Sequence, residues 1–469
     1  MKKPIRIKLA LAAVLALALL PAQARTLSGH VPEIVSHLQP VGQLNPTNRL
    51  ALAIGLPLRN RDVLTNLIQQ LYDPASTNFH RYLTPDDFTE KFGPTEADYQ
   101  TVLHFALTNG FIVTGIYSHR ELVNVSAAVS DIERAFHTHL RTYQHPVRHR
   151  EFFAPDVEPS VDATVPVEAV SGLSDFDHFE PALRRQTAPT SGPGKGTGPG
   201  GNSYRGNDFR VAYAPGVALN GAGQNVGLVE MDGYYASDIA TYENQAGLPN
   251  VPLTKVLLAG SGGYPDNNTN AVGEVSLDIE MVISMAPGLN NLYIFEGNNF
   301  DTVLGSMVTN TQIKQFSSSW GGYGFNVTGD GFLQQMAVEG QTFFQASGDG
   351  DAYTQPITAP SDDQYVTSVG GTALQMDSTA SNYVSETVWN SGFQKPAWFG
   401  NGAYTIGTNV GGYWGSGGGG STTVNIPAYQ TRCQPDRHRR VGDQAEYPGC
   451  GFDCREHLGE LFQRPDQLF

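Results

Sequence analysis

The chain has 469 residues, 40% of them hydrophobic, and a formal net charge of −16 at pH 7. This length predicts two or three globular domains, because a single hydrophobic core stops growing at about 250–300 residues. The acidic balance argues against a nucleic acid or an anionic membrane surface as the main partner, since both bind clusters of Lys and Arg.

Residues 1–24 have the pattern of a secretory signal peptide. A basic stretch, Lys2–Lys8, precedes the apolar run Leu9–Leu20, and the small-x-small pattern of Ala22–Ala24 predicts cleavage before Arg25. The alternative is a buried or anchoring helix. The apolar run is shorter than the roughly 20 residues that span a bilayer, which disfavours an anchor. We therefore predict a secreted protein with no membrane attachment after cleavage.

Residues 25–183 are predicted to form an α+β domain. Val63–Leu71 has apolar side chains at helical spacing, and Phe111–Ile116 is a short run with β-strand character. Residues 184–203 contain the run TAPTSGPGKGTGPGG, which buries too little apolar surface to fold. We expect an exposed linker there, where proteolysis is easiest.

Residues 204–430 alternate apolar strand patterns with helical patterns. The predicted strands are Asn225–Met231, Leu292–Glu296, Gln312–Phe316, Gln341–Gln345 and Tyr365–Val369. This alternation predicts an α/β fold, a parallel sheet with helices on both faces. Active groups gather at the carboxyl ends of such strands, where the loops 232–233, 317–322 and 346–350 follow.

The absence of two residue types limits the chemistry of this second region. No His and no Cys occurs between Phe179 and Gln430, so neither a Ser-His-Asp nor a Cys-His mechanism can be built from it. A hydrolase of this composition has to use a carboxylate as its base. An unperturbed carboxylate has a pKa of about 4, so the base would work mainly at acid pH.

Glu274 and Asp278 stand four residues apart in a predicted helix with an apolar stripe of Val275, Ile279 and Val282. Side chains at this spacing lie on one helical face. Two close carboxylates repel each other when both are ionised, which raises one pKa and lets the pair pass a proton. The alternative, a solvated acidic face, fits the spacing equally well.

Six short motifs follow one another from residue 274 to residue 390. They are Glu-x-x-x-Asp at 274–278, Met-Ala-Pro-Gly at 285–288, Ser-Ser-Trp-Gly at 318–321, Ala-Ser-Gly-Asp at 346–349, Tyr-Val-Thr-Ser-Val-Gly-Gly-Thr at 365–372 and Glu-Thr-Val-Trp-Asn at 386–390. In this order they resemble the sedolisin (kumamolisin-like) family of serine-carboxyl peptidases. Upstream, FHRYLTPDDFTEKFGP at 79–94 is similar to the signature of that family's activation domain. The resemblance implies a subtilisin-like parallel sheet after a ferredoxin-like activation domain.

The resemblance also implies roles for five residues. The family's charge-relay pair falls on Glu274, the general base nearest the serine, and on Asp278, which supports it. The oxyanion-stabilising carboxyl falls on Asp349, which has to be protonated to donate a hydrogen bond. Glu230 and Trp320 fall on positions that support the pair. For these two the alternative is a strand-end cap and a packing aromatic.

Two parts of the family pattern are missing from this sequence. Sedolisins carry their nucleophile in a Gly-Thr-Ser motif on a later helix, followed by a calcium site, and neither follows Gln430 here. Ser416 and Ser421 match a Gly-rich segment that precedes the nucleophile in the family, so neither is predicted to be that serine. We therefore predict no nucleophile and no metal site in this chain.

Residues 431–469 differ in character from the region before them. They gain Cys, His and Arg and lose the apolar strand pattern, which predicts an unrelated, frameshift-like tail. A zinc site is the alternative, because Cys and His bind zinc. Its ligands would be Cys433, His438, Cys450, Cys454 and His457. Their irregular spacing, and the fact that an exported protein need not keep thiols reduced, argue against it.

Two functions from different classes remain. At family level we predict a secreted acid endopeptidase made as a zymogen, with polypeptide substrates and its own pro-domain as an intramolecular inhibitor. For this particular chain the missing nucleophile removes the acyl-enzyme route. That predicts a pseudo-peptidase, which at most binds peptides or partners.

Overall fold

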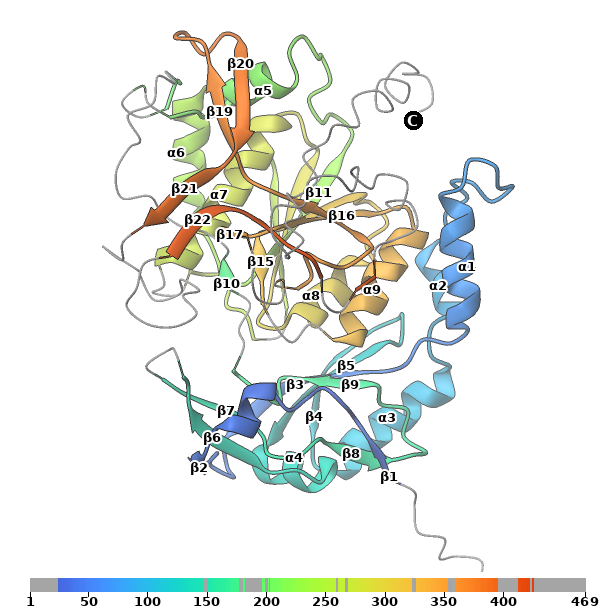
Figure 1. Cartoon of the computed structure of the whole chain (residues 1–469). Coiled ribbons are helices and arrows are strands. Elements are labelled where there is room, and N and C mark those ends of the chain that lie inside the picture. The colour runs from blue at the N-terminus through green and yellow to red at the C-terminus, as the bar shows by residue number, and fades with distance from the viewer. Residues whose placement is uncertain are drawn as a thin grey trace, which may run out of the picture.

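The computed structural model forms a lower and an upper part in Figure 1. The described residues are 24–146, 150–176, 180–181, 196–198, 201, 203–258, 260–265, 269–322, 326–352, 357, 359–394, 412–421 and 424–425. The predicted signal peptide up to residue 23, most of the predicted linker and the whole predicted tail lie outside the described residues.

The lower part is built around a four-stranded antiparallel sheet with the order β4-β5-β3-β9 (Figure 1). Its elements in chain order are β3 Arg49–Gly55, α3 Glu96–Thr108, β4 Ile112–Ile116, β5 Leu122–Ala128, α4 Val129–Phe136 and β9 Ala169–Ser171. A βαββαβ succession with this strand order is the ferredoxin-like arrangement. The predicted α+β fold of this region is therefore confirmed, and Phe111–Ile116 corresponds to β4.

The remaining elements before residue 182 extend this framework. A second antiparallel sheet has the order β2-β6-β7, and β1 pairs with β8. The bounds are β1 Ala24–Thr26, η1 Glu33–His37, β2 Pro40–Gln43, α1 Arg61–Leu71, α2 Pro85–Lys91, β6 Leu140–Gln144, β7 Glu151–Pro155, β8 Ser160–Asp162 and β10 Glu180–Pro181. The predicted helix Val63–Leu71 lies within α1.

Two capping boxes begin helices α2 and α3. The hydroxyl of Thr84 accepts a hydrogen bond from the backbone N–H of Asp87, whose carboxylate accepts one from the backbone N–H of Thr84. Thr95 and Asp98 make the same reciprocal pair. Each box satisfies backbone donors that a helix start leaves without an intrahelical partner. Both helix starts therefore follow directly from the local sequence.

The upper part contains a six-stranded, fully parallel sheet with the order β12-β13-β11-β14-β16-β18. The strands are β11 Asn225–Glu230, β12 Leu253–Leu257, β13 Asn291–Glu296, β14 Gln315–Ser318, β16 Thr342–Ala346 and β18 Val366–Val369. The chain starts in β11, adds strands on one side of it and then crosses to the other side. This is a doubly wound sheet whose switch point lies between β11 and β14.

Helices cover both faces of this sheet, as predicted (Figure 1). Helices α6 and α7 pack together on one face, and α8 and α9 pack together on the other. The bounds of the helices in this part are α5 Asn207–Tyr213, α6 Ala236–Ala246, α7 Thr269–Met285, α8 Phe300–Met307 and α9 Val327–Val338. The α/β fold class is therefore confirmed.

The predicted strands agree with the sheet except at two places. The predicted strand Gln312–Phe316 begins three residues before β14 and ends two residues before its end, because β14 is Gln315–Ser318. β12 was not predicted at all. It is an edge strand whose residues are half-buried or exposed, so it has no buried apolar run that marks it in the sequence.

Shorter strands lie at the carboxyl edge of the sheet and beyond it. They are β15 Trp320–Gly321, β17 Gly350–Ala352, β19 Thr372–Met376, β20 Tyr383–Val388, β21 Asn390–Gln394 and β22 Gly412–Gly418. β19 and β20 form an antiparallel hairpin, and β22 pairs with both β17 and β21. The Gly-rich segment of β22 thus lies beside the loop that follows β16.

The ferredoxin-like sheet packs against α8 and α9 (Figure 1). Asn124 of β5 donates a hydrogen bond to the hydroxyl of Thr302 at 2.9 Å, and the hydroxyl of Tyr72 donates one to the carbonyl of Ala337 at 2.8 Å. A Cβ on Gly55 would lie 2.0 Å from the Thr328 hydroxyl oxygen, so only glycine fits at this point of contact. The two parts therefore meet in a close interface.

Exposed valines lie on β18, at the edge of the parallel sheet, and on β20 of the hairpin that follows it. β18 pairs with β16 on one side, and no other described strand pairs with its second edge. Val369 of β18 is 49% exposed, and Val384 and Val388 of β20 are 58% and 65% exposed. Exposed apolar strand edges are sites at which chains associate.

We expect these valines to promote aggregation of the isolated chain. The double substitution Val384→Lys with Val388→Lys should lower light scattering on heating, because charge on a strand edge opposes pairing with another chain. The matched control is Val41→Lys with Val63→Lys, which changes two valines that are 57% and 61% exposed in the lower part. An equal effect of both pairs would contradict a specific role of the β18–β20 region.

Candidate active site

The candidate site lies where the parallel strands β11 and β14 end. β11 ends at Glu230 and β14 ends at Ser318, and these neighbouring strands flank the switch point of the sheet. Loops that leave the sheet in opposite directions there open a crevice at the carboxyl ends of the strands. Three of the five predicted site residues, Glu230, Trp320 and Asp349, lie on strand ends or loops at this edge of the sheet.

Helix α7 brings the other two predicted residues to the same edge. Val275, Ile279 and Ile283 are fully buried against the sheet, whereas Val282, predicted to belong to this stripe, is only half-buried. Glu274 and Asp278 are one turn apart on this helix, as predicted, and Glu274 is 4% exposed. The alternative of a solvated acidic face is therefore wrong for Glu274.

Asp278 is held by the loop that follows β14. Its Oδ1 accepts a hydrogen bond from the hydroxyl of Ser319 at 2.8 Å. Burial raises the pKa of Asp278 to about 7, and the bond from Ser319 opposes that rise. A carboxyl group with such a pKa exchanges protons near neutral pH instead of remaining ionised.

Glu230 and Trp320 are in direct contact. The indole N–H of Trp320 donates a hydrogen bond to Oε2 of Glu230 at 2.9 Å, and both side chains are buried. Burial raises the pKa of Glu230 well above the usual range, and the nearby charges of Asp278 and Glu274 raise it further. The contact with Trp320 lowers it. Glu230 is therefore electrostatically linked to both carboxylates of α7.

This arrangement can store and move protons among carboxyl groups. Within the described residues, neither Oε1 of Glu230 nor Oδ2 of Asp278 has a hydrogen-bond partner, although both atoms are inaccessible to solvent. Buried carboxylates this close cannot all be ionised, so they share protons. Such a group can accept a proton from a hydroxyl and return it later, which is general acid–base chemistry.

Glu296 is a further carboxylate of this cluster that the sequence reasoning did not single out. It is 2% exposed, it is the register partner of Glu230 on the neighbouring strand β13, and its charge also raises the pKa of Glu230. Oε1 of Glu296 accepts a hydrogen bond from the backbone N–H of Gly263 at 2.8 Å. The sequence contains part of this signal, because the predicted strands Asn225–Met231 and Leu292–Glu296 each carry a glutamate at or next to the carboxyl end, but that the strands are neighbours comes only from the structure.

Asp349 lies on the loop between β16 and β17 and is half-buried. The end of β16 is tied to the carboxylate cluster, because the side chain of Gln345 donates a hydrogen bond to the carbonyl of Trp320 at 3.1 Å. The carbonyl of Asp349 accepts a hydrogen bond from the backbone of Gly415 in β22. Its role at an oxyanion stays a prediction.

The two serines of the Gly-rich segment make other contacts. The hydroxyl of Ser416 accepts a hydrogen bond from the backbone N–H of Gly371 at 3.0 Å. The hydroxyl of Ser421 donates one to Asp362 at 2.6 Å. Among the residues that the structure describes, the serine hydroxyl bonded to a carboxylate of the α7 pair is that of Ser319.

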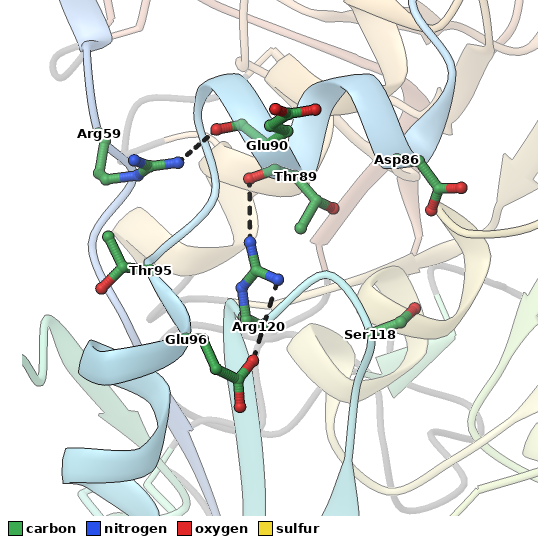
Figure 2. A pocket seen from close by; sticks show the side chains of 8 residues that line it. All are labelled: Arg59, Asp86, Thr89, Glu90, Thr95, Glu96, Ser118 and Arg120. Atoms are coloured by element: carbon green, nitrogen blue, oxygen red, sulfur yellow. Dashed lines mark hydrogen bonds and ion pairs between the residues drawn. The ribbon is translucent and has the colours of Figure 1, made fainter.

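Figure 2 shows a pocket of about 410 Å³ elsewhere, in the ferredoxin-like part. It is lined by Arg59, Asp86, Thr89, Glu90, Thr95, Glu96, Ser118 and Arg120. Its two arginines donate hydrogen bonds to backbone carbonyls at the end of α2. Arg59 donates to the carbonyl of Glu90 at 2.5 Å, and Arg120 donates to the carbonyl of Thr89 at 3.4 Å. Cationic side chains stabilise a helix C-terminus in this way. We interpret the pocket as part of the helix packing.

Within the described ranges, no group of three or more His, Cys, Asp or Glu side chains is arranged to hold a metal ion. The cysteines and histidines of the predicted tail lie outside those ranges.

We expect Asp278→Asn to flatten the dependence of stability on pH. Burial raises the pKa of Asp278 from 3.8 to about 7, so the folded chain keeps a proton that the unfolded chain releases. Stability from this group is present below pH 4 and is lost as pH rises toward 7, by up to about 4 kcal/mol. Urea unfolding between pH 4 and pH 8 measures this slope. The control is Asp62→Asn, which changes an exposed carboxylate. Equal dependence of stability on pH in the unmodified chain and in Asp278→Asn would contradict the raised pKa of Asp278.

Comparison with known proteins gives a consistent picture. Residues 36–176 match the model of the pro-kumamolisin activation domain. The chain is 26% identical to xanthomonalisin of Xanthomonas sp. (strain T-22) over 90% of its own length, but spans only 55% of that protein. It is 26% identical to sedolisin of Pseudomonas sp. (strain 101), over 89% of this chain and 72% of that protein.

Two further matches are a relative known from its sequence and a solved structure. Kumamolisin of Bacillus sp. (strain MN-32) is 24% identical over 78% of this chain and 69% of its own length. The solved structure of Pseudomonas sedolisin, a serine-carboxyl proteinase, aligns with 51% of this chain and 66% of its own at 23% identity and a TM-score of 0.42. Residues 36–176 therefore correspond to a pro-kumamolisin activation domain, and over most of its length the chain is similar to three sedolisin-type proteins.

Proposed function

We propose that this chain is the precursor form of a serine-carboxyl peptidase in which Glu274 is the general base, Asp278 supports it and Asp349 stabilises the oxyanion. The observation that carries the proposal is the set of carboxylates gathered at the ends of β11 and β14, with Asp278 bonded to Ser319 and Glu230 bonded to Trp320. A base of this kind removes the proton of an attacking hydroxyl.

Acid pH suits this mechanism for a simple electrostatic reason. Glu274 has to be ionised to act as a base, while Asp349 has to be protonated to donate a hydrogen bond to an oxyanion. Two carboxyl groups in different environments hold opposite protonation states when the pH lies between their two pKa values. We propose activity of the complete family-type site in the acid range.

The pairing of β10 with β15 supports the proposal of a zymogen. β10, at the end of the proposed pro-domain, pairs antiparallel with β15, in register with Trp320 and Gly321. An extended peptide substrate binds a free strand edge through the same backbone hydrogen bonds. β10 therefore occupies an edge next to the carboxylate cluster. We propose domain boundaries at 25–183, 184–203 and 204–430, with the first of these as an intramolecular inhibitor.

The missing nucleophile favours a second function for the chain in this form. The printed sequence contains no Gly-Thr-Ser-x-x-x-Pro segment after the Gly-rich segment. Without that serine the carboxylates have no hydroxyl to activate by the family route. We propose that this form is a pseudo-peptidase that binds extended peptides without hydrolysing them. Secretion of the chain is part of the proposal and rests on the pattern of residues 1–24.

No helix in the described part of the chain combines the length and the apolar character that crossing a bilayer requires.

We expect the recombinant chain to show no cleavage of a denatured protein substrate from about pH 3 to pH 5, where such carboxylates are poised for acid–base work. The measurement is release of acid-soluble peptides, compared with Glu274→Ala. Cleavage that Glu274→Ala abolishes would contradict the absence of a nucleophile. In that case Ser319→Ala becomes the deciding variant, because the Ser319 hydroxyl lies 2.8 Å from Asp278.

We also propose that calcium, the metal of the family, does not stabilise this chain. A ligand raises a melting midpoint only when it binds the folded state more tightly than the unfolded state. We expect equal midpoints with millimolar calcium and with a chelator, measured by differential scanning fluorimetry. Magnesium at the same ionic strength is the control. A midpoint that rises with calcium alone would show that other residues form a site.

A further inference from the structure

The turn between β4 and β5 places a histidine inside the interface between the two parts of the molecule. His119 is fully buried, although most of the other histidines in the described part of the chain have solvent access. Its ring meets Phe332 of α9 edge-on at 5.3 Å between ring centroids. A Cβ on Gly305 of α8 would lie 3.5 Å from Nε2 of His119. The imidazole thus packs directly against both helices that the pro-domain covers.

The hydrogen bonding of this ring keeps it neutral. Nδ1 of His119 accepts a hydrogen bond from the backbone N–H of Glu121 at 3.1 Å. A backbone N–H can only donate, so Nδ1 carries no proton and the ring proton is on Nε2. A second proton on Nδ1 would have to break this bond. The docked geometry therefore excludes the imidazolium form unless the turn rearranges.

The groups that face His119 give a positive charge little net support: burial and the charge of Arg120 lower its pKa, and a hydrogen bond to the backbone of Gly305 opposes them only in part. On its own turn, Arg120 is a like charge, and the ring of Tyr117 lies 5.1 Å away. Oε1 of Glu121 is 3.6 Å from Nδ1, but burial, followed by the charge of Glu339, raises the pKa of Glu121 well above its usual range. Glu121 is therefore protonated in acid and offers no counter-charge. From α8 and α9, His119 meets the backbone of Gly305 and the ring of Phe332.

We propose that His119 is an acid-sensitive contact of the pro-domain: protonation of its imidazole in acid weakens the docking of the β4–β5 turn on α8 and α9. The free turn can accept the proton, whereas the docked turn cannot. Acid therefore shifts the equilibrium toward the undocked state. This inference does not use the peptidase assignment and stands whether or not the chain hydrolyses peptides.

The direction and size follow from linkage. Burial lowers the pKa of His119 from 6.5 to about 3 in the docked state. The docked state thus binds fewer protons, so docking is at full strength above pH 6.5 and is lost progressively as pH falls toward 3. Between pH 7.5 and pH 4.5 the docking constant should fall by about 100-fold through this residue alone.

Interface carboxyl groups act in the opposite direction. Burial raises the pKa of Glu339 to about 8 and that of Glu168 above its usual value, while Arg61 is paired with Glu168 at 2.6 Å. Because Glu121, Glu168 and Glu339 favour protonation in the docked state, they strengthen docking as pH falls. The effect of His119 on docking must therefore be measured with a variant that changes His119 and leaves these three carboxyl groups in place.

The test is hydrogen–deuterium exchange of the full chain at pH 7.5 and pH 4.5, corrected for intrinsic exchange rates. His119→Asn keeps an acceptor near the position of Nδ1 and stays neutral at both pH values. The control is His104→Asn, which changes an exposed histidine of α3. Protection is compared in β5 and α8, with the central strand β11 as a reference for global unfolding.

We expect the unmodified chain and His104→Asn to lose protection in β5 and α8 at pH 4.5, by up to about 100-fold relative to His119→Asn. β11 should keep its protection in all three chains. Equal pH dependence of the unmodified chain and His119→Asn would overturn the proposal, as would a larger loss of protection at pH 4.5 in His119→Asn than in the unmodified chain. If His119→Asn lacks protection already at pH 7.5, His119→Gln replaces it, and the same two outcomes decide.

Discussion

The burial of carboxylates at the ends of the parallel strands is the constraint on which the site depends. A buried carboxylate without a hydrogen bond or a proton costs several kcal/mol. The indole of Trp320 and the hydroxyl of Ser319 each satisfy one oxygen, on Glu230 and Asp278 respectively. Both donors come from the short segment after β14. That segment is therefore held between β11 and α7, and the strand edge of β15 is positioned with it.

The same principle operates at the interface with the pro-domain, with different groups. Asp301 of α8 accepts hydrogen bonds from Ser171 and from Asn326, so one buried carboxyl joins β9, α8 and the start of α9. Burial raises the pKa of Asp301, and both bonds oppose that rise. Polar groups sealed between two surfaces need geometrically matched partners, which gives such an interface its specific orientation.

Local patterns were sufficient to predict the elements that carry the chemistry. The spacing of Glu274 and Asp278 and the apolar runs that become β11, β13 and β16 are short-range signals, and the structure agrees with them. The order of the motifs added Trp320 and Asp349 to the list of candidate site residues, and no spacing rule would have singled them out. Periodicity failed at β12, because half of an edge strand faces solvent.

Contacts between segments distant in sequence could not be predicted in this way. His119 and Phe332 are 213 positions apart, and a histidine in a turn has no periodic signal that marks it as buried. Glu296 illustrates the intermediate case. Its place at the end of a predicted strand was known, but its neighbour Glu230 became apparent only with the order of the strands.

The hydrophobic core beneath α8 and α9 includes side chains from both parts of the molecule. Ala53 of β3 and Leu122 of β5 belong to the same buried cluster as Phe316, Phe332 and the apolar face of α7. A cut in the connection after residue 181 would therefore leave two polypeptides that share one core. Before the cut, the covalent connection makes their association intramolecular, which raises the effective concentration of one part near the other. After the cut, their association becomes bimolecular, and dilution alone favours separation.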